Sequence, residues 1–487
     1  MKILFFVKGD SRFVYPRLAE AVSREQGCRV VAVTSSSVTA HRLRNTGIFD
    51  EIHDLASFLK NDVATLTDED SAAALRDLDE AVGQEGYNCL VYGDRIIRSY
   101  PFDRLNKIMA STCRFWSQVL NLSNPDAIFA EIACAAEWTA SAFARRLGIA
   151  YLAPYATPVS NRLFFIDEAQ GIWEPMMERY QTMRQHGLST AEVEEASTFL
   201  SSLRTNRTKP SFLLPALRSP LRISLPQLSK RLSRIPFRVQ TYLEDGQFEI
   251  GSYDGTPPWQ PIFTDMTRVV RHLLAESFVF DSKPLAGPTV YFPLHVQPEF
   301  TTEVRAPFAA NQLAVIEHIA KSLPPGYRLV VKEHPGMKGA RPLNFYQRIK
   351  HLYNVQLVSP SLDSHDLIKA SSVVITITGS TAWEAALYER PVITLGRTCY
   401  DCPELINYCP DITLLPSLIR KLISTYKADR RVLLCLVTAM LQSAYHGTFG
   451  NGITNPKIME SANLKDLARA IMLEVDRKRR LLIASGR

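Results

Sequence analysis

The sequence predicts an α/β fold with two parallel sheets that alternate with helices. Short apolar runs rich in β-branched residues recur along the chain, and each is closed by Gly, Pro or a polar cluster. Runs of this kind are typical of buried parallel strands. The clearest lie at residues 329–332, 373–378 and 392–395. Since 487 residues with 46% hydrophobic content exceed one ordinary domain, we expect two or three domains.

The chain opens with a β-loop-α-β pattern of Rossmann type. It consists of a strand at 2–7, a loop at 8–11, a helix at 15–26 and a second strand at 28–34. No Gly-x-Gly-x-x-Gly follows the first strand, so we expect no dinucleotide cofactor. The loop after this strand is instead expected to face a second substrate.

Two carboxylates in the first half are candidates for catalysis. Asp94 lies in a turn after a short apolar run, where an ion pair with Arg95 or Arg98 is the alternative explanation. Glu131 follows a short strand and sits at a carboxyl edge, where a general base or an electrostatic stabiliser faces the cleft. A second role explains Glu131 nearly as well: a carboxylate at the start of the next helix interacts favourably with the helix dipole.

A basic segment carries most of the formal net charge of +7. Residues 197–243 include nine Lys or Arg and no Asp or Glu. We expect the stretch 204–238 to belong to a helical insertion that contacts an anionic membrane or an anionic acceptor, since each basic residue near a charged bilayer contributes ~1 kcal/mol. A solvated helical face explains the segment equally well. No nucleic-acid-binding module is recognisable, so nucleic acid is not an expected partner.

The second half begins with a strand at residue 289, after a loop-like stretch. The polar residues His295, Gln297 and Glu299 follow this strand and are expected to point toward the cleft. They are therefore candidates for binding a ligand at the carboxyl edge of the second sheet.

The next strand of the second half ends at Lys332 and is followed by His334-Pro335. Because Pro335 restricts the preceding residue to extended backbone, it holds His334 at the carboxyl end of the strand. A lone histidine is more often structural. Together, His334 and Lys332 favour a nucleotide phosphate or a sugar carboxylate as ligand.

The run at 373–378 ends in a turn that is a candidate anion site. A helix restarts directly after Gly379-Ser380-Thr381, and its first N–H groups lack intrahelical partners. Gly379 lets the backbone approach a phosphate closely. Ser380 and Thr381 can donate hydroxyls or cap the helix, with Glu384 at the spacing of a capping box. Capping alone is the alternative.

Composition favours a cytoplasmic protein. No run approaches the ~20 apolar residues of a membrane-spanning helix, and residues 1–7 are too short for a signal-peptide core. The eight cysteines are scattered, which argues against a disulfide framework. Cys399 and Cys402 have no second pair to complete a zinc site. We expect no metal and no cofactor, and a location that extends to the inner face of the cytoplasmic membrane.

Three motifs in fixed order resemble the bacterial capsule polysaccharide biosynthesis protein family. They are YFPLHVQPE at 291–299, KEHPG at 332–336 and TGSTAWEA at 378–385. That family includes transferases that add Kdo from CMP-Kdo during surface glycan synthesis. The His-Pro pair is also similar to the nucleotide-binding motif of bacterial sialyltransferases and teichoic-acid polymerases, which use CMP-activated donors. The resemblance covers roughly residues 289–396, and the first half resembles the family only in architecture.

The resemblance implies a GT-B-like fold, in which two Rossmann-type domains face a central cleft. Residues 1–285 would form the acceptor-side domain, with a helical insertion at about 170–285. Residues 286–450 would form the domain that binds the nucleotide sugar, and residues 451–487 would be C-terminal helices.

The resemblance also implies roles for individual residues. The expected contacts are His334 and Pro335 with the phosphate and base region of CMP, Ser380 and Thr381 with the phosphate, and Gln297 and Glu299 with the donor sugar or the cleft wall. The catalytic carboxylate of such enzymes lies in the first domain. No motif there matches closely enough to be transferred, so Glu131 and Asp94 remain candidates by placement.

The expected activity is metal-independent glycosyl transfer in bacterial capsular or lipopolysaccharide synthesis, to a glycan or lipid-linked acceptor. A CMP-Kdo-like donor is favoured over an NDP-sugar. Lys332, His334 and the helix start at Ser380 would stabilise the charge on the leaving phosphate. A carboxylate of the first domain would deprotonate the acceptor hydroxyl or attack the anomeric carbon.

Three other functions fit the same sequence. A polyol-phosphate transferase would share the His-Pro site for CMP. A sugar-nucleotide epimerase would share both halves and release free sugar without an acceptor. A non-catalytic factor for polysaccharide export or assembly would keep the fold and lose the affinity for nucleotides.

Overall fold

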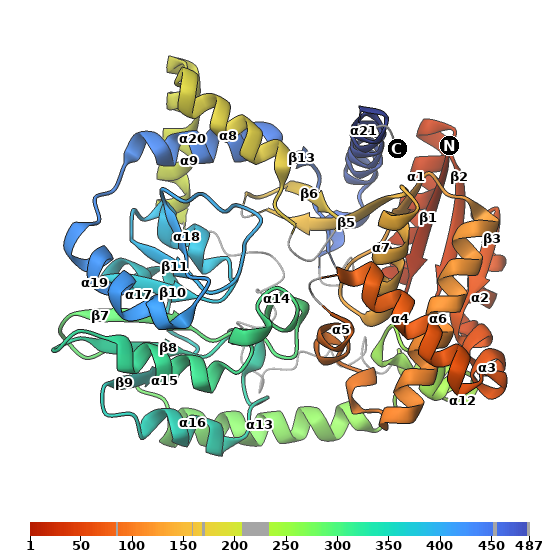
Figure 1. The fold of residues 1–487 in the computed structure, drawn as a ribbon, viewed down its shortest axis with the longest axis horizontal. Helices are drawn as coiled ribbons and strands as arrows, with labels where there is room; N and C mark the ends of the chain where they lie inside the picture. Colours follow the sequence, from red (N-terminus) through yellow and green to blue (C-terminus); the bar gives the residue numbers. More distant parts are fainter. Residues whose placement is uncertain (84–85, 158, 168–170, 207–232, 451–454, 485–487) are drawn as a thin grey trace.

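Two helix-covered sheets lie side by side in the molecule, one on each side of Figure 1. The computed structural model describes residues 1–484 except 84–85, 158, 168–170, 207–232 and 451–454. Each sheet is mainly parallel and alternates with helices along the chain. The predicted fold class, α/β with two Rossmann-type halves, is therefore confirmed.

The first sheet has the strand order β13-β6-β5-β4-β1-β2-β3. The strands from β5 to β3 are parallel, whereas β6 and β13 are antiparallel at one edge. The bounds are β1 Lys2–Val7, β2 Arg29–Thr34, β3 Glu51–Asp54, β4 Ala127–Phe129, β5 Ala150–Ala156, β6 Arg162–Ile166 and β13 Tyr445–His446. The central position of β1 fits its apolar sequence, because both faces of this strand are covered.

Helices cover both faces of the first sheet. Their bounds are α1 Tyr15–Gln26, α2 Ser37–Arg44, α3 Leu55–Thr65, α4 Asp68–Val82, α5 Tyr87–Gly93, α6 Phe102–Ser123, α7 Ala135–Arg146 and α21 Ser461–Ala484. Successive side chains of a strand point to opposite faces. Phe5 accordingly packs in one core with α1 and α21, and Phe6 packs in the other against Trp116 of α6.

The second sheet is parallel throughout, with the strand order β12-β11-β10-β7-β8-β9. The bounds are β7 Thr289–Pro293, β8 Arg328–Lys332, β9 Val355–Val358, β10 Val373–Thr376, β11 Val392–Thr394 and β12 Ile406–Tyr408. Because β7 lies between β10 and β8, the loops after these three strands meet at one edge of the sheet.

Helices also cover both faces of the second sheet. Their bounds are α14 Phe300–Glu303, α15 Gln312–Ser322, α16 Leu343–Lys350, α17 Ser364–Ala370, α18 Thr381–Leu387 and α19 Leu415–Thr425. Phe292 packs in one core with α15, α16 and α19, and Tyr291 packs in the other with α17 and α18. The alternation along β7 therefore separates two cores, as it does along β1.

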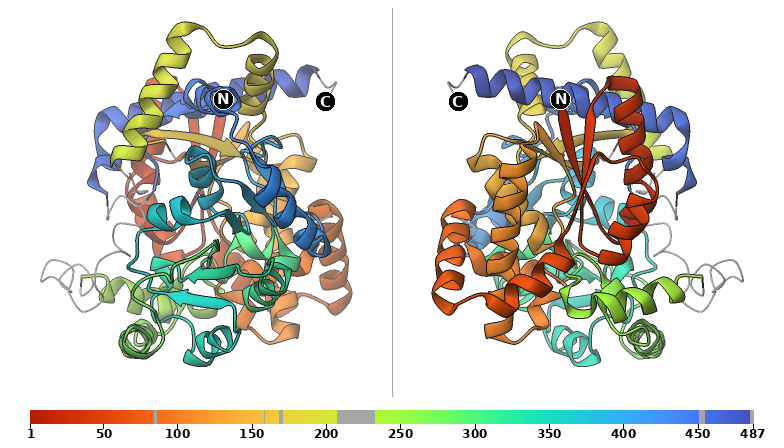
Figure 2. Two further views of the ribbon diagram at one scale, coloured as in Figure 1. Left: turned by 90° about the vertical axis from the view of Figure 1, so that its left-hand side faces the viewer. Right: turned by 90° about the vertical axis from the view of Figure 1, so that its right-hand side faces the viewer.

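Several helices connect the two halves. Their bounds are α8 Glu174–His186, α9 Thr190–Asn206, α12 Ile235–Glu244, α13 Gln260–Phe278 and α20 Arg430–Ser443. Helix α13 runs along the lower edge of Figure 1 from one half to the other. After α20 the chain returns to the first half, where β13 pairs with β6 and α21 packs on α1. Figure 2 shows α21 beside the amino terminus. The domain bounds given above stay a prediction.

Candidate functional site

His334 lies at the carboxyl end of β8, as predicted. It precedes a short 3-10 turn, Pro335–Met337, and its ring Nδ1 accepts a hydrogen bond from the N–H of Gly336 at 3.0 Å. Burial, with the charges of Lys332 and Arg341, lowers the pKa of His334 to about 4. The ring is therefore neutral near pH 7, and with Nδ1 acting as acceptor its proton resides on Nε2. His334 can thus donate one hydrogen bond to an anionic ligand.

A buried cluster behind His334 fixes the turn, and the sequence analysis did not identify it. Glu333 is fully buried and accepts hydrogen bonds from the backbone N–H of His334 at 2.7 Å, the Tyr346 hydroxyl at 2.7 Å and Nε of Arg341 at 2.9 Å. The position of Glu333 beside the His-Pro pair is a local signal that could have suggested it. Arg341 has no such signal, because only the fold brings it to the turn.

Arg341 also holds the loop after β7. Its Nη2 donates to the backbone carbonyl of His295 at 2.5 Å, and its Nη1 lies 3.4 Å from Oε1 of Gln297. The amide of Gln297 donates in turn to the carbonyl of Ala310 and to Glu303. One guanidinium group thus connects the loop that carries His295 and Gln297 to Glu333, the residue before His334, at one edge of the sheet.

His295 is buried between β7 and the turn after β10. Its Nε2 lies 3.1 Å from Oγ1 of Thr376, and its backbone N–H donates to Gln312 at 2.8 Å. Burial, with the positive potential from His334 and Arg341, lowers the pKa of His295 to about 3. His295 is therefore a neutral supporting residue in this structure.

The turn after β10 packs directly on His295. A Cβ on Gly379 would lie 2.9 Å from Nε2 of His295 and 3.0 Å from Oγ1 of Thr376, so the fold itself requires a glycine there. The alternative explanation, that Ser380 caps the helix, does not hold in the structure. Its backbone is already helical (φ −56°, ψ −17°), and its side chain makes no cap hydrogen bond. Its hydroxyl instead lies 3.4 Å from Oε1 of Glu384.

The remaining predicted residues of the second half differ in their surroundings. Lys332 is buried and its Nζ donates to Oγ of Ser364 at 3.1 Å, at the start of α17. Pro335 and Thr381 are both partly exposed at the same edge. Gln297 lines a cavity of about 760 Å³ together with Met337 from the His-Pro turn and several residues of α13.

Asp94 is buried in the first half. Within the part of the chain that the structure describes, its carboxylate accepts hydrogen bonds from backbone N–H groups only. The donors are the N–H groups of Ile96 at 2.7 Å, Ile97 at 3.0 Å and Ala135 at 2.8 Å. The alternative ion pair with Arg95 or Arg98 is not formed. Burial nevertheless raises the pKa of Asp94 above its ordinary value. Asp94 thus joins the turn after α5 to the start of α7.

Glu131 lies two residues beyond the end of β4 and lines a large cavity, of about 1100 Å³. Glu131 is not the carboxylate that accepts hydrogen bonds at the start of the next helix. That role belongs to Glu137, which accepts the N–H groups of Ala133 at 2.8 Å and Cys134 at 3.1 Å at the start of α7. Glu131 thus lines the cavity without serving this helix start, and its catalytic role stays a prediction.

Lys8 is a further charged residue of this cavity that the sequence analysis placed only as part of a loop. It follows β1, and its Nζ lies 3.3 Å from Oε2 of the buried Glu137. Burial alone would lower the pKa of Lys8, but Glu137 and Glu131 outweigh it and the pKa is raised. Lys8 is therefore a partly exposed cation that is paired with Glu137 and lines the same cavity as Glu131.

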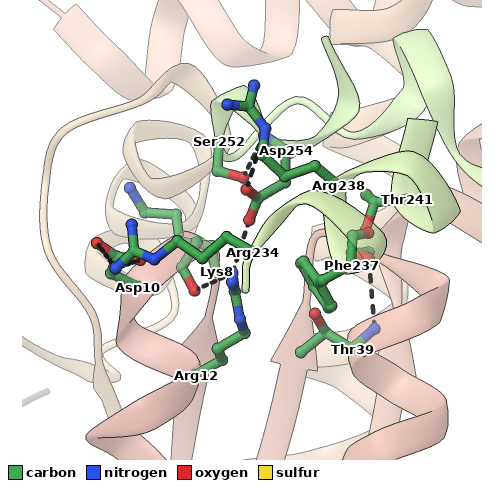
Figure 3. A network of polar contacts seen from close by, with 12 residues as sticks. Lys8, Asp10, Arg12, Thr39, Arg234, Phe237, Arg238, Thr241, Ser252 and Asp254 are labelled. Atoms are coloured by element: carbon green, nitrogen blue, oxygen red, sulfur yellow. Dashed lines mark hydrogen bonds and ion pairs between the residues drawn. The ribbon is translucent and has the colours of Figure 1, made fainter. Parts of the chain in front are cut away.

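Figure 3 shows a network of polar contacts that joins the segment after β1 to the start of α12 and to the loop around Asp254. Arg234 lies 3.3 Å from Asp10, and Arg12 lies 2.6 Å from Asp254. Arg238 donates to the carbonyl of Tyr253 at 2.7 Å. The loop at 8–11, expected to face a second substrate, does line this cavity.

Arg95 is the link between the two parts of the site. It lines the large cavity, and its Nε donates to the carbonyl of Pro298 at 2.8 Å while its Nη2 lies 3.7 Å from Glu299. Glu299 also accepts from the hydroxyl of Thr301 at 2.9 Å. The polar edge of the second sheet and the cavity of the first half thus meet at this residue.

Most of the basic stretch 204–238 lies outside the described residues, so its expected contact with a membrane stays a prediction. Arg204, at its start, is held by the carbonyl of Leu387 and by Glu389. Within the described chain, no helix is long and apolar enough to cross a membrane. The same residues hold no group of three or more His, Cys, Asp or Glu placed to bind a metal ion.

Comparisons with known proteins agree with the predicted resemblance over part of the chain. Residues 270–409 match the model of the family described as capsule polysaccharide biosynthesis protein. A segment of 133 residues is 28% identical to protein FixF of Sinorhizobium fredii. The matched segment covers 26% of this chain and 31% of that protein. The chain thus spans about a third of the length of this relative.

Comparison with solved structures found matches of low similarity. The Thermosulfurimonas dismutans KpsC β-Kdo 2,7 transferase is 11% identical, with a TM-score of 0.37, over 72% of this chain and 89% of that one. The UDP-GlcNAc 2-epimerase of Methanocaldococcus jannaschii is also 11% identical, with a TM-score of 0.31, over 94% of this chain and 98% of that one.

Proposed function

We propose that this protein is a metal-independent glycosyltransferase of bacterial surface polysaccharide synthesis. It moves a sugar from a nucleotide-activated donor, CMP-Kdo-like before NDP-sugar, to a glycan or lipid-linked acceptor. The family match over residues 270–409 supports this proposal, because it includes all three motifs of the second half.

The observation that carries the proposal is the geometry of His334. Glu333 and Arg341 fix its backbone, and the Gly336 N–H occupies its Nδ1, so the ring offers Nε2–H at the edge where β7, β8 and β10 end. A neutral donor held in this way can stabilise the charge that develops on a leaving nucleotide phosphate. Ser380 and Thr381, which follow β10, supply further hydroxyl donors at the same edge.

The large cavity of the first half is the proposed acceptor side. Glu131 is the carboxylate we assign as general base, or as nucleophile if configuration is retained, because it lines this cavity. The three backbone hydrogen bonds of Asp94 favour a positioning role for that residue.

Nucleotide binding by the purified protein tests the donor side of the proposal. Thermal unfolding is followed with CMP, UDP, GDP or ADP, with and without EDTA. A ligand at 100 times its dissociation constant adds about 2.7 kcal/mol to the free energy of unfolding. We expect selective stabilisation by CMP that EDTA does not change and that His334→Ala removes. His351→Ala is the matched control, because this histidine is exposed at the end of α16.

The outcomes separate the candidate functions. Stabilisation by UDP or GDP keeps the transferase and replaces the donor. If no nucleotide raises the unfolding temperature, the transferase proposal fails and an assembly factor takes its place. With the selected nucleotide sugar, release of nucleotide only when an acceptor is present identifies a transferase. Release of free sugar without an acceptor identifies an epimerase instead.

A further inference from the structure

Helix α13 separates two cavities that lie on its opposite faces. Ile262 and Val269 line the large cavity of the first half. Thr264 and Arg271 each follow two positions later, about 200° around the helix, and line the cavity of about 760 Å³. We call this second space the α13 cavity. Its size is that of ligand pockets, which measure about 300–1,000 Å³.

A second wall of the α13 cavity comes from the loops of the candidate donor site. Met337 follows the His-Pro pair, and its N–H donates to the carbonyl of His334 at 2.8 Å. Gln297 follows β7 and also lines the cavity. A Cβ on Gly339 would lie 1.8 Å from the carbonyl oxygen of Arg268, so α13 packs directly on the loop after the His-Pro turn. The α13 cavity therefore adjoins the strand ends at which His334 lies.

The charge of the α13 cavity is positive. Arg268 and Arg271 line it, and none of the described residues that line it is Asp or Glu. Neither guanidinium group has an ion pair or a hydrogen bond within the described part of the chain. By contrast, Arg341, Arg348 and Arg397 of the second half lie 2.9–3.8 Å from a carboxylate oxygen. Two unpaired arginines on one wall can bind an anion, and the planar fork of arginine matches a phosphate.

Aromatic rings lie in the same cavity. Trp259 and Phe263 are one helical turn apart, and both line it. They are 55% and 64% exposed, so their rings are available to a ligand. The edge of Trp259 is held by Tyr242 of α12, with ring centroids 5.9 Å apart. Nucleobases stack on exposed aromatic side chains of this kind. Thr264 and Thr267 add neutral hydrogen-bonding groups to the wall.

We infer that the α13 cavity binds the nucleotide part of the activated donor, with the phosphate on Arg268 and Arg271 and the base against Trp259 and Phe263. A nucleoside phosphate supplies both an anion and a planar ring, which are the two features that this lining matches. An acidic sugar supplies the anion without the planar ring. The inference rests on the proposed function, because it takes the donor as the ligand. It makes Arg268 and Arg271 specificity-determining residues for the phosphate.

Tryptophan fluorescence reports on this cavity, because Trp259 is the exposed tryptophan of the five. Trp116, Trp138, Trp173 and Trp383 are at most 2% exposed. The full-length protein is titrated with CMP, with cytidine and with inorganic phosphate. We expect CMP to quench the emission, because its base stacks on Trp259. Trp259→Phe should remove the quenching, whereas thermal unfolding of this variant should still report CMP binding.

The double variant Arg268→Gln/Arg271→Gln measures the contribution of charge by titration calorimetry. It keeps the backbone contact of Arg268 with Gly339, and it should lower the affinity for CMP by about tenfold or more. The affinity for cytidine should not change, because cytidine has no phosphate. Arg328→Gln/Arg348→Gln is the matched control. It removes the same charge from two exposed residues of the second half outside the cavity, and it should bind CMP as the unchanged protein does.

Free N-acetylneuraminate tests whether a sugar carboxylate takes the place of the phosphate. If the arginine double variant weakens its binding and leaves that of CMP unchanged, the cavity holds the sugar and the inference is wrong. CMP binding that requires His334 but neither quenches Trp259 nor depends on the two arginines also overturns the inference and leaves the proposed function intact. Quenching by CMP that depends on both arginines, in a protein that transfers no sugar, supports the cavity and contradicts the proposed function. If no nucleotide binds, both fail.

Discussion

At the scale of single residues, Arg341 determines the geometry of the candidate donor site. Its guanidinium contacts Glu333, the carbonyl of His295 and the amide of Gln297, so one side chain joins the loops after β7 and β8. Both Arg341 and Glu333 are buried. The planar fork of arginine makes these several contacts possible, which lysine could not reproduce.

Replacing Arg341 should therefore destabilise the protein strongly. Arg341→Met leaves the buried Glu333 carboxylate without its cation, and we expect a loss of about 3–5 kcal/mol in the free energy of unfolding by urea. Arg348→Met is the control, because its pair with Glu317 is largely exposed and 3.8 Å long, and should cost under about 1 kcal/mol. Equal losses in the two variants would contradict a structural role for Arg341.

The lowered pKa values of His295 and His334 predict acid sensitivity. Unfolded histidine titrates near 6.5, whereas burial lowers the pKa of His295 to about 3 and that of His334 to about 4. Between these values the unfolded chain binds more protons, so stability is complete above about pH 6.5 and falls as the pH is lowered toward 4. Urea unfolding across this range should show a slope of at most about 1.4 kcal/mol per pH unit for each histidine.

The variant His295→Gln isolates one of these contributions. It keeps a polar side chain beside Thr376 but removes the titration, so its free energy of unfolding should depend less on pH than that of the unchanged protein. If the two slopes are the same, His295 titrates normally in the folded protein and the assignment of a buried neutral ring is wrong.

At the scale of elements, the loop after the His-Pro turn anchors α13 through Gly339. This glycine has a left-handed φ of +66°, and its missing Cβ makes room for the carbonyl of Arg268. One position thus meets two demands, a positive φ and a close backbone approach. The sequence around Gly339 shows neither demand, because the partner lies 71 residues earlier in the chain.

Gly339→Ala should separate these two demands when compared with Gly326→Ala. Gly326 has a similar φ of +82° but nothing within 4 Å of its added Cβ. Gly326→Ala should cost only the left-handed penalty of about 1–2 kcal/mol. Gly339→Ala should cost more, and α13 should become accessible to proteases. A loss no larger than that of Gly326→Ala would show that α13 does not depend on this contact.

At the scale of the whole molecule, the last helix completes the first half. Leu464, Leu467, Ile471 and Val475 of α21 are buried in the same core as Phe5 and α1. Burial of such side chains contributes about 1.5–3 kcal/mol each. Their sum is comparable with the total stability of a typical domain, about 5–15 kcal/mol. The two chain ends are therefore parts of one folding unit.

Removal of α21 tests this dependence. A chain that stops at Glu460 should lose the cooperative unfolding of the first half, followed by circular dichroism and limited proteolysis. A chain that stops at Ala484 keeps the helix and is the control. Cooperative unfolding unchanged in the shorter chain would mean that α21 is dispensable for this half.

The sequence by itself determined the fold class, because local patterns carry it. The apolar runs at β1, β2, β7, β8, β10 and β11 were predicted within a few residues. The edge strands β3, β12 and β13, and β6 next to β13, were not, since they are short and their pairing depends on distant segments. His334 and Gly379 were also identified at strand ends, because Pro and Gly restrict or free the backbone locally.

Only the tertiary structure decided how these residues are surrounded. Arg341 contacts Glu333 and His295. Glu137, and not Glu131, accepts hydrogen bonds at the start of α7, and Ser380 makes no cap hydrogen bond. Ile262, Met266 and Val270 of α13 line the same cavity as Glu131, a neighbourhood that only the fold creates. The physical reason is the distance along the chain over which each effect acts. Periodicity and backbone restriction act between near neighbours, whereas burial, ion pairing and pKa shifts depend on residues that folding alone brings together.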